Sequence, residues 1–184
     1  MNTAFTWGTT TAERQLAFPC DQVLPAFDQD MWRGVTVAAP AATVFRWVCQ
    51  LRAAPYSYDW IDNGGRCSPQ RLVPGLDHLA VAQTVMTIFQ IVSFVPDEQL
   101  TVQIKPTPLA TRVFGDGAIS YVLVPCTSTT TRLLAKLRVR YSRAPLRAVL
   151  RVLLPWGDLL MMRKQLITLK RLAERDPAVM QTVP

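Results

Sequence analysis

The feature that most constrains the fold is a change of hydrophobic period late in the chain. Between residues 81 and 141, four segments are rich in the β-branched and aromatic residues that favour strands: 81–95, 100–105, 118–125 and 129–141. From Leu146 to Ala173 the apolar residues instead recur every three or four positions, which is the period of a helix. A run of strands followed by one long helix predicts an α+β fold.

Turn signals and sidedness predict how these strands pair. Residues 96–99 (Pro-Asp-Glu-Gln) are typical of a turn, and residues 126–128 stand where a hairpin connection is expected, so neighbouring strands should be antiparallel. Residues 85–95 are apolar at both parities, which predicts one strand covered on both sides. In the last segment apolar residues alternate with a row that includes Arg132, Lys136, Arg138 and Arg140. We expect that face to be wet and basic.

The long helical segment contains a proline. Pro155 removes one backbone donor and clashes with the preceding turn. We therefore expect a kink or a short break near Trp156 and Gly157, with Asp158 as a possible cap of the second half.

The first part of the chain predicts an arm, one strand and helical turns. Residues 1–30 lack clear periodicity and are expected to form an extended arm. Residues 31–37 favour a strand, and Pro40 suits the first position of the helix that follows. The segment 56–63 is short and rich in aromatic residues, which predicts one or two further helical turns. We expect three parts: an arm (1–30), one folded domain (31–176) and a C-terminal tail (177–184).

Composition supports one folded domain. The chain has 184 residues, of which 49% are hydrophobic and 18% charged, which is enough apolar material for one sizeable core. No stretch has the roughly 18 uninterrupted apolar residues of a bilayer-spanning helix. The first 30 residues lack the pattern of a targeting signal, so we expect a soluble, cytoplasmic protein. The four cysteines are scattered without neighbouring histidines, so neither a metal site nor a cofactor is expected.

The positive charge is concentrated near the C-terminus. The formal net charge is +7, and residues 131–184 alone hold 12 Lys and Arg against 3 Asp and Glu. Arg143, Arg147 and Arg151 are spaced four apart and form a basic stripe on an amphipathic helix. This stripe is either the solvated side of a core helix or a surface for anionic membrane. No nucleic acid is expected, because no reading motif is present and the basic residues are not interleaved with stacking aromatics.

Two segments resemble the START-like (SRPBCC) superfamily. The first lies within residues 39–65 and contains Trp47, Cys49-Gln50-Leu51 and Pro55-Tyr56-Ser57-Tyr58-Asp59-Trp60. The second, Gly157-Asp158-Leu159-Leu160-Met161-Met162-Arg163-Lys164-Gln165-Leu166 continuing to residue 174, looks like the closing helix of bacterial members. The resemblance covers residues 30 to 176. It implies a helix-grip fold, in which a curved antiparallel sheet wraps around a long C-terminal helix.

Members of this superfamily include lipid carriers, hormone receptors, polyketide aromatase/cyclases and co-chaperones, so the fold alone does not choose a function. Our leading hypothesis is a non-catalytic protein that binds a small hydrophobic ligand, such as a lipid, an isoprenoid or a polyketide-like molecule, in an internal cavity. One alternative is a cyclase, aromatase or dehydratase of secondary metabolism. Another is a peripheral membrane or partner-binding module that uses the basic C-terminal helix. The sequence does not indicate an oligomeric state.

The candidate site residues follow from these hypotheses. Tyr58, Asp59 and His78, the sole histidine, are the candidates for catalysis. The expected ligand-binding residues are Tyr56, Tyr58, Asp59, Trp60, Phe89, Gln90 and Met162. Within residues 56–62, helical spacing would place aromatic and carboxylate groups together at a cavity entrance. The structural alternative is that Trp60 packs in the core while Asp59 or Asp62 caps a helix end or pairs with Arg66. Gln90 is expected to point inward because it shares parity with Ile88 and Val92.

Overall fold

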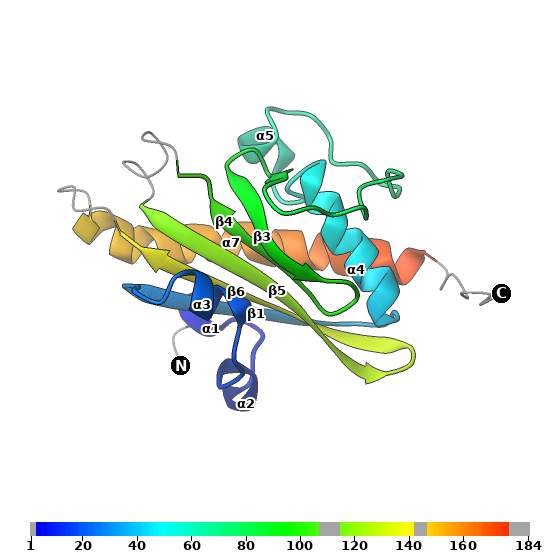
Figure 1. The fold of residues 1–184 in the computed structure, drawn as a ribbon, viewed down its shortest axis with the longest axis horizontal. Coiled ribbons are helices and arrows are strands. Elements are labelled where there is room, and N and C mark those ends of the chain that lie inside the picture. The colour runs from blue at the N-terminus through cyan, green and yellow to red at the C-terminus, as the bar shows by residue number, and fades with distance from the viewer. Residues whose placement is uncertain (1–2, 107–114, 142–146, 177–184) are drawn as a thin grey trace.

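The computed structural model describes residues 3–106, 115–141 and 147–176 (Figure 1). The elements before the hairpins are α1 (Thr3–Thr6), α2 (Thr11–Arg14), α3 (Pro19–Val23), β1 (Gln29–Val37), α4 (Ala41–Cys49), the 3₁₀ helix η1 (Gln50–Arg52) and α5 (Asp59–Asp62). They are followed by β2 (Thr84–Val85), β3 (Phe89–Val95), β4 (Gln99–Ile104), β5 (Asp116–Thr127), β6 (Thr130–Arg140) and α7 (Arg147–Arg175).

The strands form one six-stranded antiparallel sheet in the order β1-β6-β5-β4-β3-β2. Strands β2 to β6 follow one another as a meander, and β1 closes the far edge by pairing with β6. Helix α7 runs lengthwise across one face of this sheet (Figure 1). The structure therefore confirms the predicted α+β arrangement of a curved sheet around a long C-terminal helix.

The core lies between the sheet and the two larger helices. On β5 and β6 alternate residues, such as Tyr121 and Leu133, face this core. At one end Trp47 of α4 and Leu166 of α7 are completely buried and fill the space above the strands. This end of the sandwich is therefore packed solid by aromatic and aliphatic side chains.

The expectation of a wet, basic face on β6 is wrong. The side chain of Lys136 is only 5% exposed, and that of Arg138 is similarly buried. Lys136 Nζ lies 2.6 Å from a carboxylate oxygen of Asp21, and Arg138 Nε lies 2.8 Å from one of Asp30. Acidic residues from the first 30 positions therefore neutralise Lys136 and Arg138, which the local pattern of β6 cannot show.

The segment before β1 covers the outer face of the sheet. The sequence predicts an extended arm over residues 1–30, but the described part of this segment contains the three short helices α1, α2 and α3. Phe18, Cys20 and Leu24 pack on Ala118 and Leu134 of the outer sheet face.

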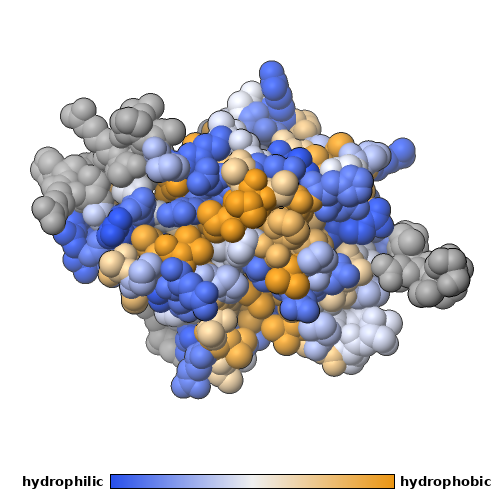
Figure 2. Space-filling view, in the orientation of Figure 1, coloured by the Kyte–Doolittle hydropathy of each residue, from blue (hydrophilic) through white to orange (hydrophobic). Residues whose placement is uncertain are grey.

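On the face shown in Figure 2, hydrophobic residues form separate clusters divided by hydrophilic side chains.

The predicted single strand over residues 85–95 is interrupted. β2 ends at Val85 and β3 begins at Phe89, and the turn between them holds Met86 and Thr87 at φ 44° and 65°. The amide of Met86 donates to the carbonyl of Leu51, which fixes the turn against η1. The unbroken apolar run therefore hides a tight turn.

The predicted break in the C-terminal helix is also wrong, because α7 continues through Pro155. Arg33 is buried beneath this point, and its guanidinium donates to the carbonyl of Pro155 at 3.4 Å and to Asp158 at 2.6 Å. Asp158 is therefore an ion-pair partner instead of a helix cap. Of the expected basic stripe, Arg147 pairs with Asp28 and Arg151 is exposed, while Arg143 lies outside the described residues.

Candidate functional site

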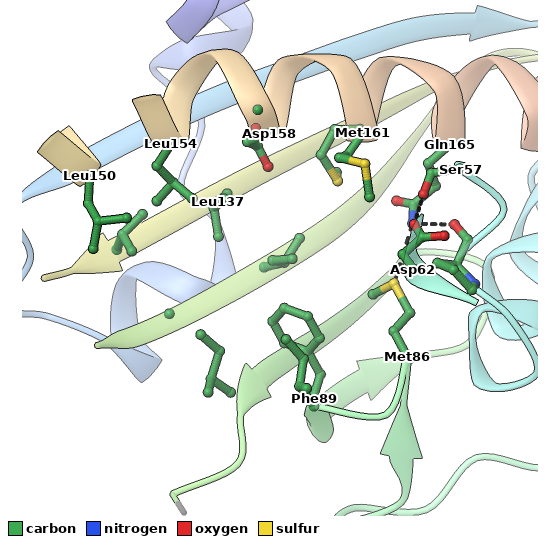
Figure 3. Close-up of a pocket in the computed structure, with 18 of the residues that line it drawn as sticks. Ser57, Asp62, Met86, Phe89, Leu137, Leu150, Leu154, Asp158, Met161 and Gln165 are labelled. Atoms are coloured by element: carbon green, nitrogen blue, oxygen red, sulfur yellow. Dashed lines mark hydrogen bonds between the residues drawn. The ribbon is translucent and has the colours of Figure 1, made fainter. Parts of the chain in front are cut away.

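A cavity of about 360 Å³ lies between α7 and the inner face of the sheet (Figure 3). Its apolar walls include Ile104, Ile119, Leu137 and Val139 from the strands, and Leu150, Leu154, Met161 and Met162 from α7. Figure 3 shows Leu154, Asp158 and Met161 extending from α7 toward Phe89 and Leu137. Because Ile88 and Gly157 in its wall are exposed, the cavity is not sealed from solvent.

The position of the cavity follows from how the core is filled. At the other end of the sheet, Trp47 of α4 occupies the space beneath the second half of α7. Beneath the first half, β5 contributes Gly117 and α7 contributes Gly157 to the wall, and neither residue has a side chain to fill the space. The space that larger side chains would fill at this end remains as the cavity.

A polar cluster bounds one end of the cavity. Ser57, in the segment after η1, donates its hydroxyl hydrogen to Oδ2 of Asp62 in α5. Oδ1 of Asp62 is buried and has no hydrogen-bond partner within the described residues. An unpaired buried acceptor of this kind is uncommon in folded proteins, and a hydrogen-bond donor on a bound molecule would satisfy it.

Gln165 holds this end of the cavity together. Its side chain is buried, its Nε2 donates to the carbonyl of Pro55 at 2.7 Å, and its Oε1 accepts from the hydroxyl of Tyr121 at 2.7 Å. Both ends of the amide are therefore used within the protein. Gln165 thus acts as a positioning group that joins α7 to the segment before α5 and to β5.

Asp158 places a second carboxylate in the cavity wall. Burial raises the pKa of Asp158 to about 6, against the opposing influence of the Arg33 guanidinium 2.6 Å away. Burial likewise lowers the pKa of Arg33. Desolvation thus outweighs the attraction within the pair. Asp158 therefore holds a proton more readily than an exposed carboxyl group does.

The structure brings two of the seven predicted ligand-binding residues, Phe89 and Met162, into the cavity wall. Tyr56 is buried in the neighbouring core, with its ring edge-on to Trp47 at 6.1 Å between centroids, and it does not line the cavity. Gln90 pairs across the sheet with Thr84 and Gln103 and is also absent from the cavity wall.

The other predicted residues do not line the cavity. Asp59 accepts from the amide of Ser68 at 2.7 Å and from its hydroxyl at 2.5 Å, so its carboxylate anchors a loop. Tyr58 is half-buried as the residue before α5, and Trp60 is 76% exposed instead of packing in the core. His78 is exposed in the loop before β2. The structure does not gather Tyr58, Asp59 and His78 into a catalytic group.

The sequence reasoning missed Asp158 and Gln165 as cavity residues. Both share one helical stripe with Met162 and Leu169, at spacings of four, three and four residues. A polar residue within an apolar helical stripe was the available signal. Among the described residues, no cluster of three or more His, Cys, Asp or Glu is arranged to hold a metal ion.

A scan against models of protein families finds no match, and a search of curated proteins finds none either. Among solved structures, the Zhui aromatase/cyclase from Streptomyces sp. R1128 is similar with a TM-score of 0.50 and 17% identity over 80% of this chain and 94% of that chain. A protein from Arthrobacter aurescens has a TM-score of 0.50 and 10% identity over 85% and 95%.

The di-domain aromatase/cyclase BexL of the BE-7585A biosynthetic pathway gives a TM-score of 0.51 and 11% identity. That match covers 80% of this chain and 47% of BexL. Likeness at this level of identity concerns the fold. The chain therefore has the helix-grip fold that its resemblance to the START-like superfamily implies.

Proposed function

We propose that this protein binds one small, mostly apolar molecule in the cavity beneath α7. The observation that carries the proposal is the cavity itself: about 360 Å³ of space with aliphatic and thioether walls and a polar cluster at one end. Small-molecule sites typically measure about 300–1,000 Å³ and combine apolar walls with a few placed polar groups.

The polar cluster indicates which ligands fit. Asp62 and Asp158 are acceptors when ionised, and the free Oδ1 of Asp62 needs a hydrogen-bond donor. A buried acceptor without a partner costs about 1–3 kcal/mol, which a ligand hydroxyl would offset. An anionic head group at this end would instead face the Asp62 carboxyl group. The favoured ligand is therefore a neutral apolar molecule with a hydroxyl group, such as an isoprenoid alcohol or a reduced polyketide.

An enzymatic function of the cyclase or dehydratase type is the second candidate. The similar solved structures include two aromatase/cyclases, and the pKa of Asp158, about 6, suits proton transfer near neutral pH. In this candidate function, Asp158 would carry the proton and Asp62 would orient the substrate. This candidate function does not involve the catalytic candidates from the sequence, Tyr58, Asp59 and His78, because none of the three lines the cavity.

We also propose that residues 31–176 are the ligand-binding domain and that residues 1–30 belong to it as a cover of the outer sheet face. The support is the packing of Phe18 and Leu24 on the sheet and the ion pairs of Asp21 and Asp30 with β6.

Two neighbouring residues of α7 provide a matched test. Met161 lines the cavity, whereas Leu160 is 58% exposed on the outside of the same helical turn. Met161→Trp should fill the cavity and weaken binding of the neutral fluorescent probe Nile red at least about tenfold, since a loss of about 1.4 kcal/mol suffices. Leu160→Trp should leave Nile red affinity unchanged. Equal affinities of the two variants would show that the probe does not occupy the cavity.

For the enzymatic candidate, the test is turnover of linear poly-β-ketone substrates. Asp158→Asn should abolish turnover while Nile red still binds, and wild-type turnover in this variant would reject Asp158 as the proton carrier.

A further inference from the structure

Helix α7 carries a continuous apolar ridge on its solvent side. The ridge consists of Val149, Val152, Leu153, Trp156 and Leu160. Each of these side chains is between 48% and 64% exposed. Spacings of four, three and four residues place Val149, Leu153, Trp156 and Leu160 along one side of the helix, and Val152 lies on the same side, three residues from Val149. This side faces away from the buried Leu159 and Met162. A row of five large exposed apolar residues is unusual for a protein surface that contacts only water.

Basic residues border one end of the ridge. Arg163 and Lys164 are exposed where the ridge ends, whereas the exposed Arg151, two residues from Val149, lies on the opposite side of the helix. Further along α7, Arg171 is exposed, whereas Glu174 pairs with Lys170 at 3.2 Å. Apolar residues in the centre with basic residues at the border are the pattern of helices that lie in the interface of an anionic membrane.

We propose that α7 docks on an anionic lipid surface, with the ridge inserted between the head groups and the flanking Arg and Lys residues paired with lipid phosphates and carboxylates. The helix would lie in the plane of the membrane. No helix within the described ranges is long and apolar enough to cross a bilayer. Trp156 sits in the middle of the ridge, and its indole is suited to the boundary between acyl chains and water.

Charge favours a lipid surface over a second copy of this chain. The formal charge of +7 on each chain opposes association of two copies, and Arg163 and Lys164 at the end of the ridge would add like charges to such a contact. Anionic head groups provide the opposite charge at each of these positions.

The ridge also lies directly beside the cavity wall. Four ridge residues are each followed in sequence by a residue that lines the cavity: Val149 by Leu150, Leu153 by Leu154, Trp156 by Gly157 and Leu160 by Met161. Successive residues of a helix are about 100° apart, so the two stripes run side by side along α7. A docked ridge therefore brings the cavity wall that contains the exposed Gly157 next to the lipid.

This arrangement would let an apolar ligand pass between bilayer and cavity without crossing water. That consequence rests on the proposed ligand-binding function, whereas docking itself does not.

Vesicle flotation tests the docking. Wild-type protein should float with vesicles of phosphatidylcholine and phosphatidylserine, bind much less to phosphatidylcholine alone, and detach as salt is raised. The double substitution Leu153→Gln and Trp156→Gln should reduce binding to the anionic vesicles at least about tenfold, because two large apolar side chains no longer insert. Val81→Gln is the matched control, since Val81 is a 62% exposed apolar residue outside α7, and it should bind as wild type does.

Equal binding to neutral and anionic vesicles, or wild-type binding by the double variant, would overturn the proposal. A ridge-dependent dimer in light scattering, without vesicle binding, would overturn it in favour of a second copy. Nile red titration of the same variants separates the two proposals. Normal Nile red affinity without flotation would reject docking alone, whereas flotation without any cavity-dependent binding would reject the ligand-binding function.

Discussion

Replacing Arg33 tests the buried ion pair that supports the cavity wall. Arg33 is 1% exposed, and its guanidinium contacts Asp158 at 2.6 Å and the carbonyl of Ala4 at 2.8 Å. Arg33→Met keeps a long side chain but leaves Asp158 buried without its cation. Loss of one member of a buried pair costs about 3–5 kcal/mol, so the free energy of unfolding at pH 7 should fall by that amount.

The pH dependence of the unfolding free energy tests whether the unpaired Asp158 causes this loss of stability. The folded-state pKa of Asp158, about 6, lies above its ordinary value of 3.8, so the folded chain holds this proton more tightly than the unfolded chain. The resulting stability is fully present below pH 3.8 and is lost as the pH rises to about 6. Without Arg33 the pKa rises further, so Arg33→Met should lose less stability at pH 5 than at pH 7.

Urea unfolding followed by circular dichroism measures these differences. The double variant Arg33→Met, Asp158→Leu should recover at least about half of the loss, because no unpaired charge remains in the core. An equal loss at pH 5 and pH 7, or a double variant as unstable as the sum of the two single variants, would refute the reasoning.

Three further predictions follow from individual residues. Gly157→Ala should raise the unfolding free energy by about 1 kcal/mol in the same urea assay, because an added Cβ meets no atom within 4 Å and the helix loses a flexible residue. Gln165→Leu should lower it by about 1–3 kcal/mol, because the Tyr121 hydroxyl and a backbone carbonyl lose their partner; an unchanged midpoint would contradict the positioning role. Of the four cysteines, Cys67 and Cys126 are exposed and should react rapidly with a thiol reagent at pH 8. Cys20 and Cys49 should react slowly, because burial shields both thiols from the reagent and raises their pKa to about 11 and about 12.

The order of the main elements and the antiparallel pairing of neighbouring strands could be predicted because both depend on local pattern. The alternation in residues 129–141 and the helical period after residue 146 are set by which side must be buried, and the structure has β6 and α7 at these places. The burial of Lys136 could not be predicted in this way. Its partners Asp21 and Asp30 are more than 100 positions away in the chain, and only the tertiary fold brings the charges together.

The site was less predictable than the fold for similar reasons. The inward orientation of Gln90 was inferred from its parity with Ile88 and Val92. Ile88 belongs to the turn before β3, and the register shifts between Ile91 and Ser93, so the parity does not run through the strand. The Tyr58–Asp59 segment attracted attention through its composition, but Asp59 is used by its own loop. Asp158 and Gln165 were identifiable, because both interrupt the apolar stripe of α7.

Native mass spectrometry of freshly purified protein, followed by denaturing extraction, tests the central claim most directly. The account predicts one neutral, apolar, hydroxyl-bearing molecule per chain, which is lost from Met161→Trp and retained by Leu160→Trp. A chain that carries no molecule and takes up no apolar alcohol at saturating concentration would contradict the claim that the cavity is a binding site.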